Sequence, residues 1–356
     1  MSAAREAASR ALSGALPDVL RRRSLALLVQ SAGRLGDAEQ LRAVAGDCRE
    51  DPWLACQLAR EFVRLGDSAA ATRAIGALLD SGELELDVRG ELASLRAVLA
   101  LNAGDYFEQL RHWQSALAAY EQLGMRNAAC ATLGEIGFCQ SLLGDFPAAN
   151  VSIEAAHREA EQRGYVHVRA WLLCIWGPVL GELGKLERAI EVERAALAAF
   201  VDDPRLSGAC WAYLAQLHLK AGQLDDAEEA AQRAAALLEP YSPLFGLALA
   251  ALGRVGLARG DARAMVDVER RAAQLFAADT EFEEGRALLQ LVRCELCEAL
   301  GQTQRAAELA RQAATELEQR ARAIASKTAR KRFLDQVAEH RALLERAATE
   351  HPRSSA

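Results

Sequence analysis

The sequence predicts an all-α protein, a solenoid of about eight antiparallel helix pairs that ends in a C-terminal capping helix. Three observations predict this fold. A glycine recurs at even spacing between two apolar helical stretches, and small residues recur at fixed distances from it. The 356-residue chain also contains only 8 prolines, with alanine dominating its apolar residues. Alanine favours helices, and its small size lets them pack closely.

The recurring glycine marks the turn inside each predicted helix pair. Its positions are Gly36, Gly66, Gly104, Gly144, Gly184, Gly222, Gly260 and Gly301, with successive spacings of 30, 38, 40, 40, 38, 38 and 41 residues. A glycine at this point supplies a positive φ that ends the first helix. In several units aspartate follows the glycine, where it is expected to cap the next helix.

Small residues keep a constant register to the turn glycine. Seven residues before it the units carry Ala59, Ala97, Gly137, Gly177, Ala215, Gly253 and Cys294. Five residues after it they carry Ala71, Ala149, Ala189, Ala227, Met265 and Ala306. Apolar residues elsewhere in each unit follow the helix period. We therefore expect two helices to approach closely in every unit.

The units resemble the tetratricopeptide repeat (TPR) family, and the best matches are residues 133–156 and 211–237. Their spacing exceeds that family's usual repeat of about 34 residues. They look like the longer-helix variety in bacterial signalling ATPases and kinases. The resemblance implies a right-handed α-solenoid, and it implies a role as a binding scaffold in bacterial signalling or regulation.

The C-terminal segment resembles the terminal helix that closes such arrays. Arg332-Phe333-Leu334 is followed by Val337, His340 and Leu343-Leu344. An end repeat needs one apolar face and one polar face. The expected organisation is an N-terminal helical extension (1–21), a repeat array (22–319), a capping helix (320–350) and a disordered tail (351–356). The segment from Arg320 to Arg332 is basic, and its role stays open between a solvated end and a docking site for an acidic partner.

Composition limits the classes of partner. Hydrophobic residues make up 51% and charged residues 26%, and the net charge is −7, which gives no general attraction to nucleic acid or anionic lipid. No stretch of apolar residues is long enough to cross a membrane. No secretion signal is recognised, and the eight cysteines lie scattered in apolar helical context. We expect a cytoplasmic protein with reduced thiols, no nucleic-acid or membrane partner, and an oligomeric state that the sequence leaves open.

Motifs for catalysis, cofactors and metals are absent or better explained by packing. No phosphate-binding loop, dinucleotide motif or hydrolase motif occurs. Cys294 and Cys297 form a CxxC, but it lies within a helix and lacks further ligands at metal spacing, so core packing is the preferred interpretation. His218 is expected to pack, and a metal site at His157 and His167 is disfavoured. We expect no enzyme, no cofactor and no metal.

A groove on the concave face is the remaining candidate site, because the first helices of TPR pairs line that face. The expected groove positions are Arg23, Gln30, Trp53, Arg60, Phe138, Trp171, Pro178, Gln216, Arg254, Leu288 and Glu295. Aromatic and arginine side chains dominate binding hot spots. The preferred function is a non-enzymatic scaffold for a protein or peptide. The alternative is a sensor of a small molecule or peptide, with a pocket near Trp171, Trp176 and Pro178. Because Pro178 lies inside a predicted helix, we also expect a bend or widened turn there.

Overall fold

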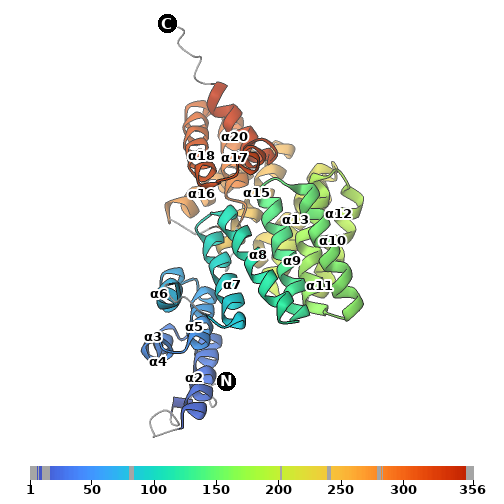
Figure 1. The fold of residues 1–356 in the computed structure, drawn as a ribbon. Coiled ribbons are helices and arrows are strands. Elements are labelled where there is room, and N and C mark those ends of the chain that lie inside the picture. The colour runs from blue at the N-terminus through green and yellow to red at the C-terminus, as the bar shows by residue number, and fades with distance from the viewer. Residues whose placement is uncertain are drawn as a thin grey trace. The chain divides into compact units, whose positions relative to one another are not determined.

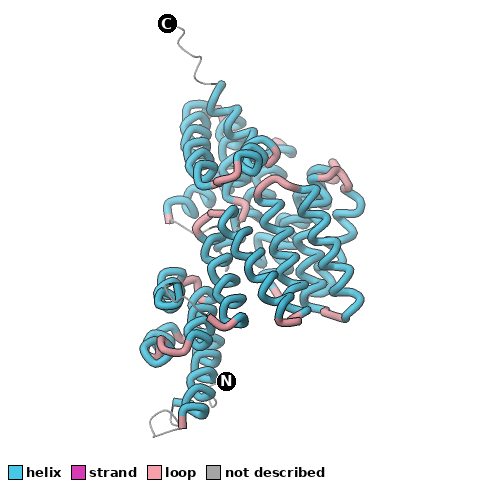
Figure 2. Tube along the Cα trace, viewed as in Figure 1, coloured by secondary structure: helices cyan, strands magenta, loops and turns pink. Residues whose placement is uncertain are grey.

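The computed structural model describes residues 17–79, 84–200, 203–238, 242–278 and 284–349, together with residues 6, 8, 9 and 282. These residues form helices joined by short loops, and the described part of the chain contains no β-strand (Figure 2). The chain divides into two compact units. Residues 1–103 and 108–129 form unit 1, and residues 104–107 and 130–356 form unit 2. The predicted all-α array of helix pairs is confirmed.

Unit 1 contains the first helix pairs, drawn in blue and cyan in Figure 1. Its helices are α2 (Asp18–Leu35), α3 (Ala38–Ala43), α4 (Ala45–Cys48), α5 (Pro52–Arg64), α6 (Ser68–Leu79), α7 (Leu86–Asn102) and most of α8 (Tyr106–Gln122). The second helix of the first pair is interrupted at Val44, which separates α3 from α4. Most of the predicted N-terminal extension (1–21) lies outside the described residues. At its end, α2 already begins at Asp18.

Unit 2 contains the regular repeats and the C-terminal helices. They are α9 (Arg126–Leu142), α10 (Phe146–Arg163), α11 (Val166–Glu182), α12 (Leu186–Ala199), α13 (Pro204–Lys220), α14 (Leu224–Leu238), α15 (Ser242–Arg259), α16 (Ala262–Ala277), α17 (Arg286–Ala299), α18 (Thr303–Ala323), α19 (Lys327–Asp335) and α20 (Ala338–Thr349). Odd-numbered helices from α9 to α17 are the first helices of their pairs. No helix among the described residues is both long and apolar enough to span a bilayer.

All of the predicted turn glycines have a positive φ, between 67° and 77°. Several of the following aspartates cap the next helix as expected: the Asp37 carboxylate accepts from the Gln40 amide at 3.0 Å, and Asp67 accepts from Ala70 at 2.9 Å. Among the described residues, three further glycines have positive φ, namely Gly124, Gly164 and Gly285. They lie between pairs, so the chain uses the same backbone device at those junctions.

The small residues in fixed register form the centre of each pair. Ala59, Ala97, Ala215 and Cys294 are all 0% exposed, and so are Ala71, Ala149, Ala189 and Ala227 in the second helices. A β-carbon placed at Gly137 would lie 2.6 Å from the Ile153 side chain of α10. The close helix approach predicted from the register is therefore present.

The segment expected as one capping helix is divided among three elements. Helix α18 extends to Ala323, and α19 and α20 follow it. The Phe333 side chain of α19 is 1% exposed and its ring centroid lies 6.3 Å from that of Tyr106. The Arg332 guanidinium pairs with the Asp145 carboxylate at 2.5 Å. The Arg332 carbonyl oxygen lies so close to Gly144 that a β-carbon at position 144 would be 2.8 Å from it. The cap thus packs on the first residues of unit 2 and on its first turn.

The basic segment Arg320–Arg332 takes part in these contacts. Arg320 binds the Tyr106 hydroxyl at 3.3 Å and Glu316 at 3.1 Å, while Arg330 donates to the Ile324 carbonyl at 2.7 Å. Three of its arginines therefore contact the cap, while Arg322, Lys327 and Lys331 are exposed, as expected of a solvated end.

Acidification should weaken the cap through His340. Its Nδ1 lies 2.7 Å from the Phe333 carbonyl oxygen. Burial lowers the pKa of His340 below its ordinary value of 6.5; Arg320 lowers it further, while Glu339 and the bond to Phe333 oppose the shift. The His340 imidazole therefore binds a proton more tightly in the unfolded chain than in the folded one. The contribution of neutral His340 to the free energy of unfolding is complete above about pH 6.5 and is lost as the pH falls towards the folded-state pKa.

Urea unfolding between about pH 8 and pH 5 measures this effect. The variant H340N keeps a donor for the carbonyl and does not titrate, so its stability should fall less steeply with pH than that of the wild type. Equal slopes in the two proteins would show that His340 is not the titrating group.

Candidate binding cavity

Unit 2 contains a partly open cavity of about 230 Å³ between the first helices of its repeats and its C-terminal cap. The lining comes from residues of α9, α11, α13, α15 and α17 on one side and of α18 and α20 on the other. They include Phe138, Leu142, Ile175, Pro178, Val179, Tyr213, Gln216, Leu247, Arg254, Ala287, Leu288, Leu317, Val337 and His340. Because the cap covers it, this site is more enclosed than the open groove expected from the sequence.

Four residues at one equivalent position of successive repeats line the cavity, and we call them the ladder. Phe138, Pro178, Gln216 and Arg254 each stand six residues before a turn glycine, and all four line the cavity. Consecutive first helices thus present equivalent positions to the same space. Gln216 and Arg254 are joined by a hydrogen bond of 3.1 Å from the Arg254 guanidinium to the Gln216 side-chain oxygen Oε1.

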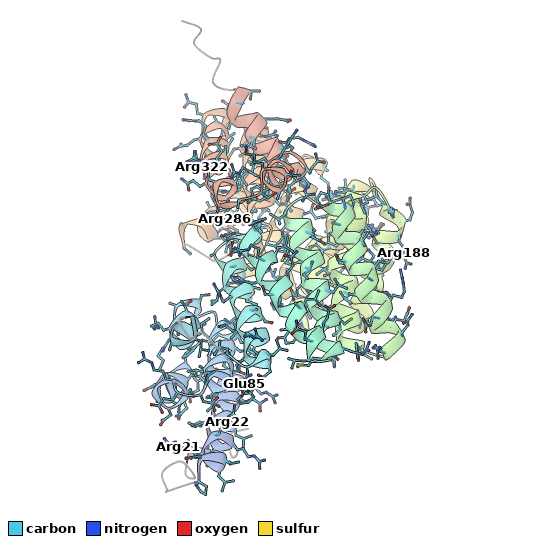
Figure 3. All side chains as sticks on the ribbon, viewed as in Figure 1. Arg21, Arg22, Glu85, Arg188, Arg286 and Arg322 are labelled. Atoms are coloured by element: carbon cyan, nitrogen blue, oxygen red, sulfur yellow. The ribbon has the colours of Figure 1, made fainter. Side chains whose placement is uncertain are left out.

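Charged side chains of both signs surround the apolar part of the lining. The basic ones are Lys220, Arg254, Arg286 and Arg320, and the acidic ones are Glu182, Glu284, Glu316 and Glu339. Glu316 binds Arg286 at 2.6 Å, Arg320 at 3.1 Å and the Gln290 amide at 3.0 Å. Figure 3 labels Arg286 at the start of α17. Its guanidinium also lies 5.0 Å and 5.2 Å from the ring centroids of Phe276 and Phe282.

Tyr213 and Lys220 of α13 are held by acidic partners. The Tyr213 hydroxyl donates to Glu284, and Lys220 pairs with Glu182 of α11. Burial raises the pKa of the Tyr213 phenol well above its ordinary value, and Glu284 raises it further. The phenol is therefore a neutral donor at physiological pH. The cavity presents polar groups in fixed positions around an apolar interior.

Leu288 also lines the cavity, whereas the other predicted groove residues do not: Arg23, Gln30, Trp53, Arg60, Trp171 and Glu295. Arg23 is exposed on α2, Arg60 pairs with Glu91, and Trp53 is half-buried with the Arg22 guanidinium 5.4 Å from its ring centroid. All three belong to unit 1. Trp171 in unit 2 packs over Gly134, where a β-carbon would lie 2.9 Å from the indole ring. Trp53 and Trp171 thus pack against neighbouring side chains while remaining partly exposed.

The alternative pocket combined Trp171, Trp176 and Pro178, which all lie on α11. Trp176 is 8% exposed; its indole N–H donates to the Asn150 side chain at 2.9 Å and its ring lies 5.4 Å from that of His157. Only Pro178 reaches the cavity. Helix α11 continues as α-helix through Pro178 from Val166 to Glu182, so the expected widened turn is not formed.

Two other sequence motifs are explained by packing, as predicted. Cys294 and Cys297 are both 0% exposed on α17 and unpaired. His218 is 5% exposed, and its Nδ1 lies 2.6 Å from the Gln223 side-chain oxygen at the following turn.

Residues that close the cavity were not recognised from the sequence. Tyr106, Arg286, Glu316 and Arg320 come from the start of unit 2 and from its end. The only available signal was the resemblance of the C-terminal segment to a cap, which does not say where that cap docks.

Comparison with solved structures identifies similar folds. A Rap protein complexed with Competence and Sporulation Factor aligns with a TM-score of 0.65 at 12% identity, over 92% of this chain and 98% of that one. The Rap conjugation gene regulator of plasmid pLS20, in complex with the Phr* peptide, aligns with a TM-score of 0.54 at 11% identity, over 90% of this chain and 94% of that one. At these identities the likeness concerns the fold.

Sequence comparison identifies closer relatives. The chain is 27% identical over 208 residues to the HTH-type transcriptional regulator MalT of Yersinia pestis, which covers 52% of this chain and 22% of that protein. It is 29% identical over 190 residues to MalT of Cronobacter sakazakii, covering 51% of this chain and 20% of that protein. The match thus spans about a fifth of each relative. Residues 90–350 match the model of the MalT-like TPR region, and the chain belongs to that family.

Proposed function

We propose that this chain is a non-enzymatic binding scaffold whose unit 2 cavity holds part of a short peptide. The observation that carries the proposal is the ladder of Phe138, Pro178, Gln216 and Arg254, which presents one position from each of four consecutive repeats to a single cavity. Repeat arrays bind through such stacked equivalent positions.

The chemistry of the lining suits a peptide. An apolar interior takes a hydrophobic side chain, and fixed polar groups orient a ligand at its edge. The lining carries four basic and four acidic side chains, so it offers partners for an ammonium group and for a carboxylate. A volume of about 230 Å³ has room for one or two side chains, so most of the peptide would lie outside the cavity.

The similar Rap structures support the peptide as ligand class, since one is in complex with the Phr* peptide. The MalT relatives are transcriptional regulators, which supports a regulatory adaptor role for this chain. A cytoplasmic setting belongs to the same proposal, since the eight buried cysteines would remain free in a reducing compartment.

Selection from a random displayed peptide library, followed by fluorescence anisotropy with the enriched sequences, tests the proposal. We expect peptides with an apolar residue next to a charged group and dissociation constants of about 1–100 µM. A selection that enriches no peptide, together with stabilisation of the protein by a non-peptide metabolite in a thermal screen, would favour the small-molecule sensor instead.

A further inference from the structure

A second polar site lies inside the core of unit 2, separate from the cavity. Cys174 of α11, Glu193 of α12 and Cys210 of α13 come from three consecutive helices, which lie side by side in Figure 1. Their two sulfur atoms and a carboxylate oxygen all lie within 4.8 Å of one another. Within the described ranges of the chain, this is the only group of three such side chains that converges in this way.

Glu193 is the feature that packing does not explain. The residue is 0% exposed, and apart from the Cys210 thiol its carboxylate has no hydrogen-bond partner. Removing a charged carboxylate from water is costly, so a buried carboxyl group is protonated, paired with an opposite charge or bound to a metal. An apolar or small residue would fill the same position without that cost. A bound cation would stabilise the charged form of Glu193.

The backbone of α11 makes room for this carboxylate. A β-carbon at Gly177 would lie 2.2 Å from Glu193 Oε1 and 2.5 Å from its Cγ. The glycine at this position therefore allows the Glu193 side chain to extend between α11 and α12 toward the cysteines. The carboxylate and the two thiols form a compact donor set of one oxygen and two sulfurs.

We propose that Cys174, Glu193 and Cys210 bind a zinc ion. Thiolate and carboxylate are ordinary zinc ligands, with bond lengths of about 2.3 Å and 2.0–2.2 Å, which bring ligand atoms within about 4 Å of one another. A water molecule or the second Glu193 oxygen would occupy the fourth coordination position of the zinc ion. Both thiols release their protons as the metal binds. The sequence led us to expect no metal, so this assigns a role to two cysteines for which none was expected.

Zinc at this position would connect the helices that support the cavity. Ile175 and Val179 follow Cys174 on α11 and Tyr213 follows Cys210 on α13, and all three line the cavity. A metal bound to α11, α12 and α13 fixes these walls relative to one another. The site does not depend on the peptide function, because its ligands face the core and are absent from the cavity lining.

The register of the repeats supplies variants that should fold. Ten residues before the turn glycine the next two repeats carry Ala212 and Ala250 where α11 carries Cys174. Twelve residues before it α15 carries Ala248 where α13 carries Cys210, and Ala212, Ala248 and Ala250 are each 0% exposed. C174A and C210A therefore place an alanine where the fold already accepts one. E193Q keeps the shape of the side chain and removes its charge.

The test uses the full chain, reduced and freed of metal with a chelator, and titrated with zinc chloride and with cobalt chloride. We expect about one equivalent of tightly bound zinc per chain, a rise in melting temperature, and thiolate-to-cobalt charge-transfer absorption in the near ultraviolet. Loss of an outer-shell partner alone weakens metal binding about 10–100-fold, so C174A and C210A should weaken it at least about 100-fold. E193Q should also weaken zinc binding.

The matched control is the double variant C294A–C297A, which removes a second pair of buried cysteines and should bind zinc like the wild type. The proposal is overturned if the folded wild-type chain takes up no zinc, or if C174A–C210A binds it as tightly as the wild type. Helix content by circular dichroism identifies any variant that fails to fold, and the wild-type titration decides the matter in that case.

Discussion

Replacing Ala287 with tryptophan should abolish binding of peptides selected on the wild-type chain. Ala287 lies at the start of α17, is half-buried and lines the cavity, so an indole at this position occupies the space proposed for the ligand. We expect affinity to fall at least about 30-fold, which corresponds to a loss of about 2 kcal/mol. Fluorescence anisotropy with the selected peptides measures it.

The matched control is A199W. Ala199 is exposed at the end of α12 and is absent from the cavity lining, so the same substitution there should leave binding unchanged. Equal affinity of A287W and wild type would place the binding site elsewhere. W171A provides a further contrast, since Trp171 packs over Gly134 and should change stability more than affinity.

The variant R293M should be among the most destabilising single changes in unit 2. Arg293 of α17 is buried and makes two parallel bonds to Glu269 of α16, at 2.9 Å and 3.0 Å. Arg305 adds a third contact to the same carboxylate at 2.7 Å, but its side chain is half exposed. In R293M the buried Glu269 keeps only this half-exposed partner, so we expect a cost of about 3 kcal/mol, the lower end of the range for breaking a buried pair. Urea unfolding monitored by circular dichroism measures the loss.

The double variant R293M–E269M separates the charge from the packing. Replacing both partners of a buried ion pair with apolar residues is often neutral. We therefore expect the double variant to regain most of the stability lost in R293M. A double variant as unstable as R293M would show that the loss arises from packing around Arg293 and not from the buried charge of Glu269.

The repeat architecture could be predicted from the sequence because it depends on local signals. The turn glycines require a positive φ, and the small residues in register allow close helix approach; both requirements act within one helix pair. The ladder positions Phe138, Pro178, Gln216 and Arg254 follow from the same register. Their placement along one cavity needed only the regular stacking of pairs.

Closure of the cavity could not be predicted, because it depends on contacts between residues far apart in the chain. Arg320 reaches Tyr106 across 214 residues, and Arg332 pairs with Asp145. No periodic pattern specifies such a pairing. The cysteines illustrate the same limit: Cys174 and Cys210 look like packing residues until the structure places the buried Glu193 between their helices.

Site-specific photo-crosslinking tests the central claim most directly. A photoreactive residue in place of Ser141, which lines the cavity from α9, should crosslink to a selected peptide, and the adduct is mapped by mass spectrometry. The same residue in place of Val151, which is 66% exposed on α10 and absent from the lining, should not. Crosslinking at position 141 alone is the predicted result. Crosslinking at position 151, with none at position 141, would contradict binding in the cavity.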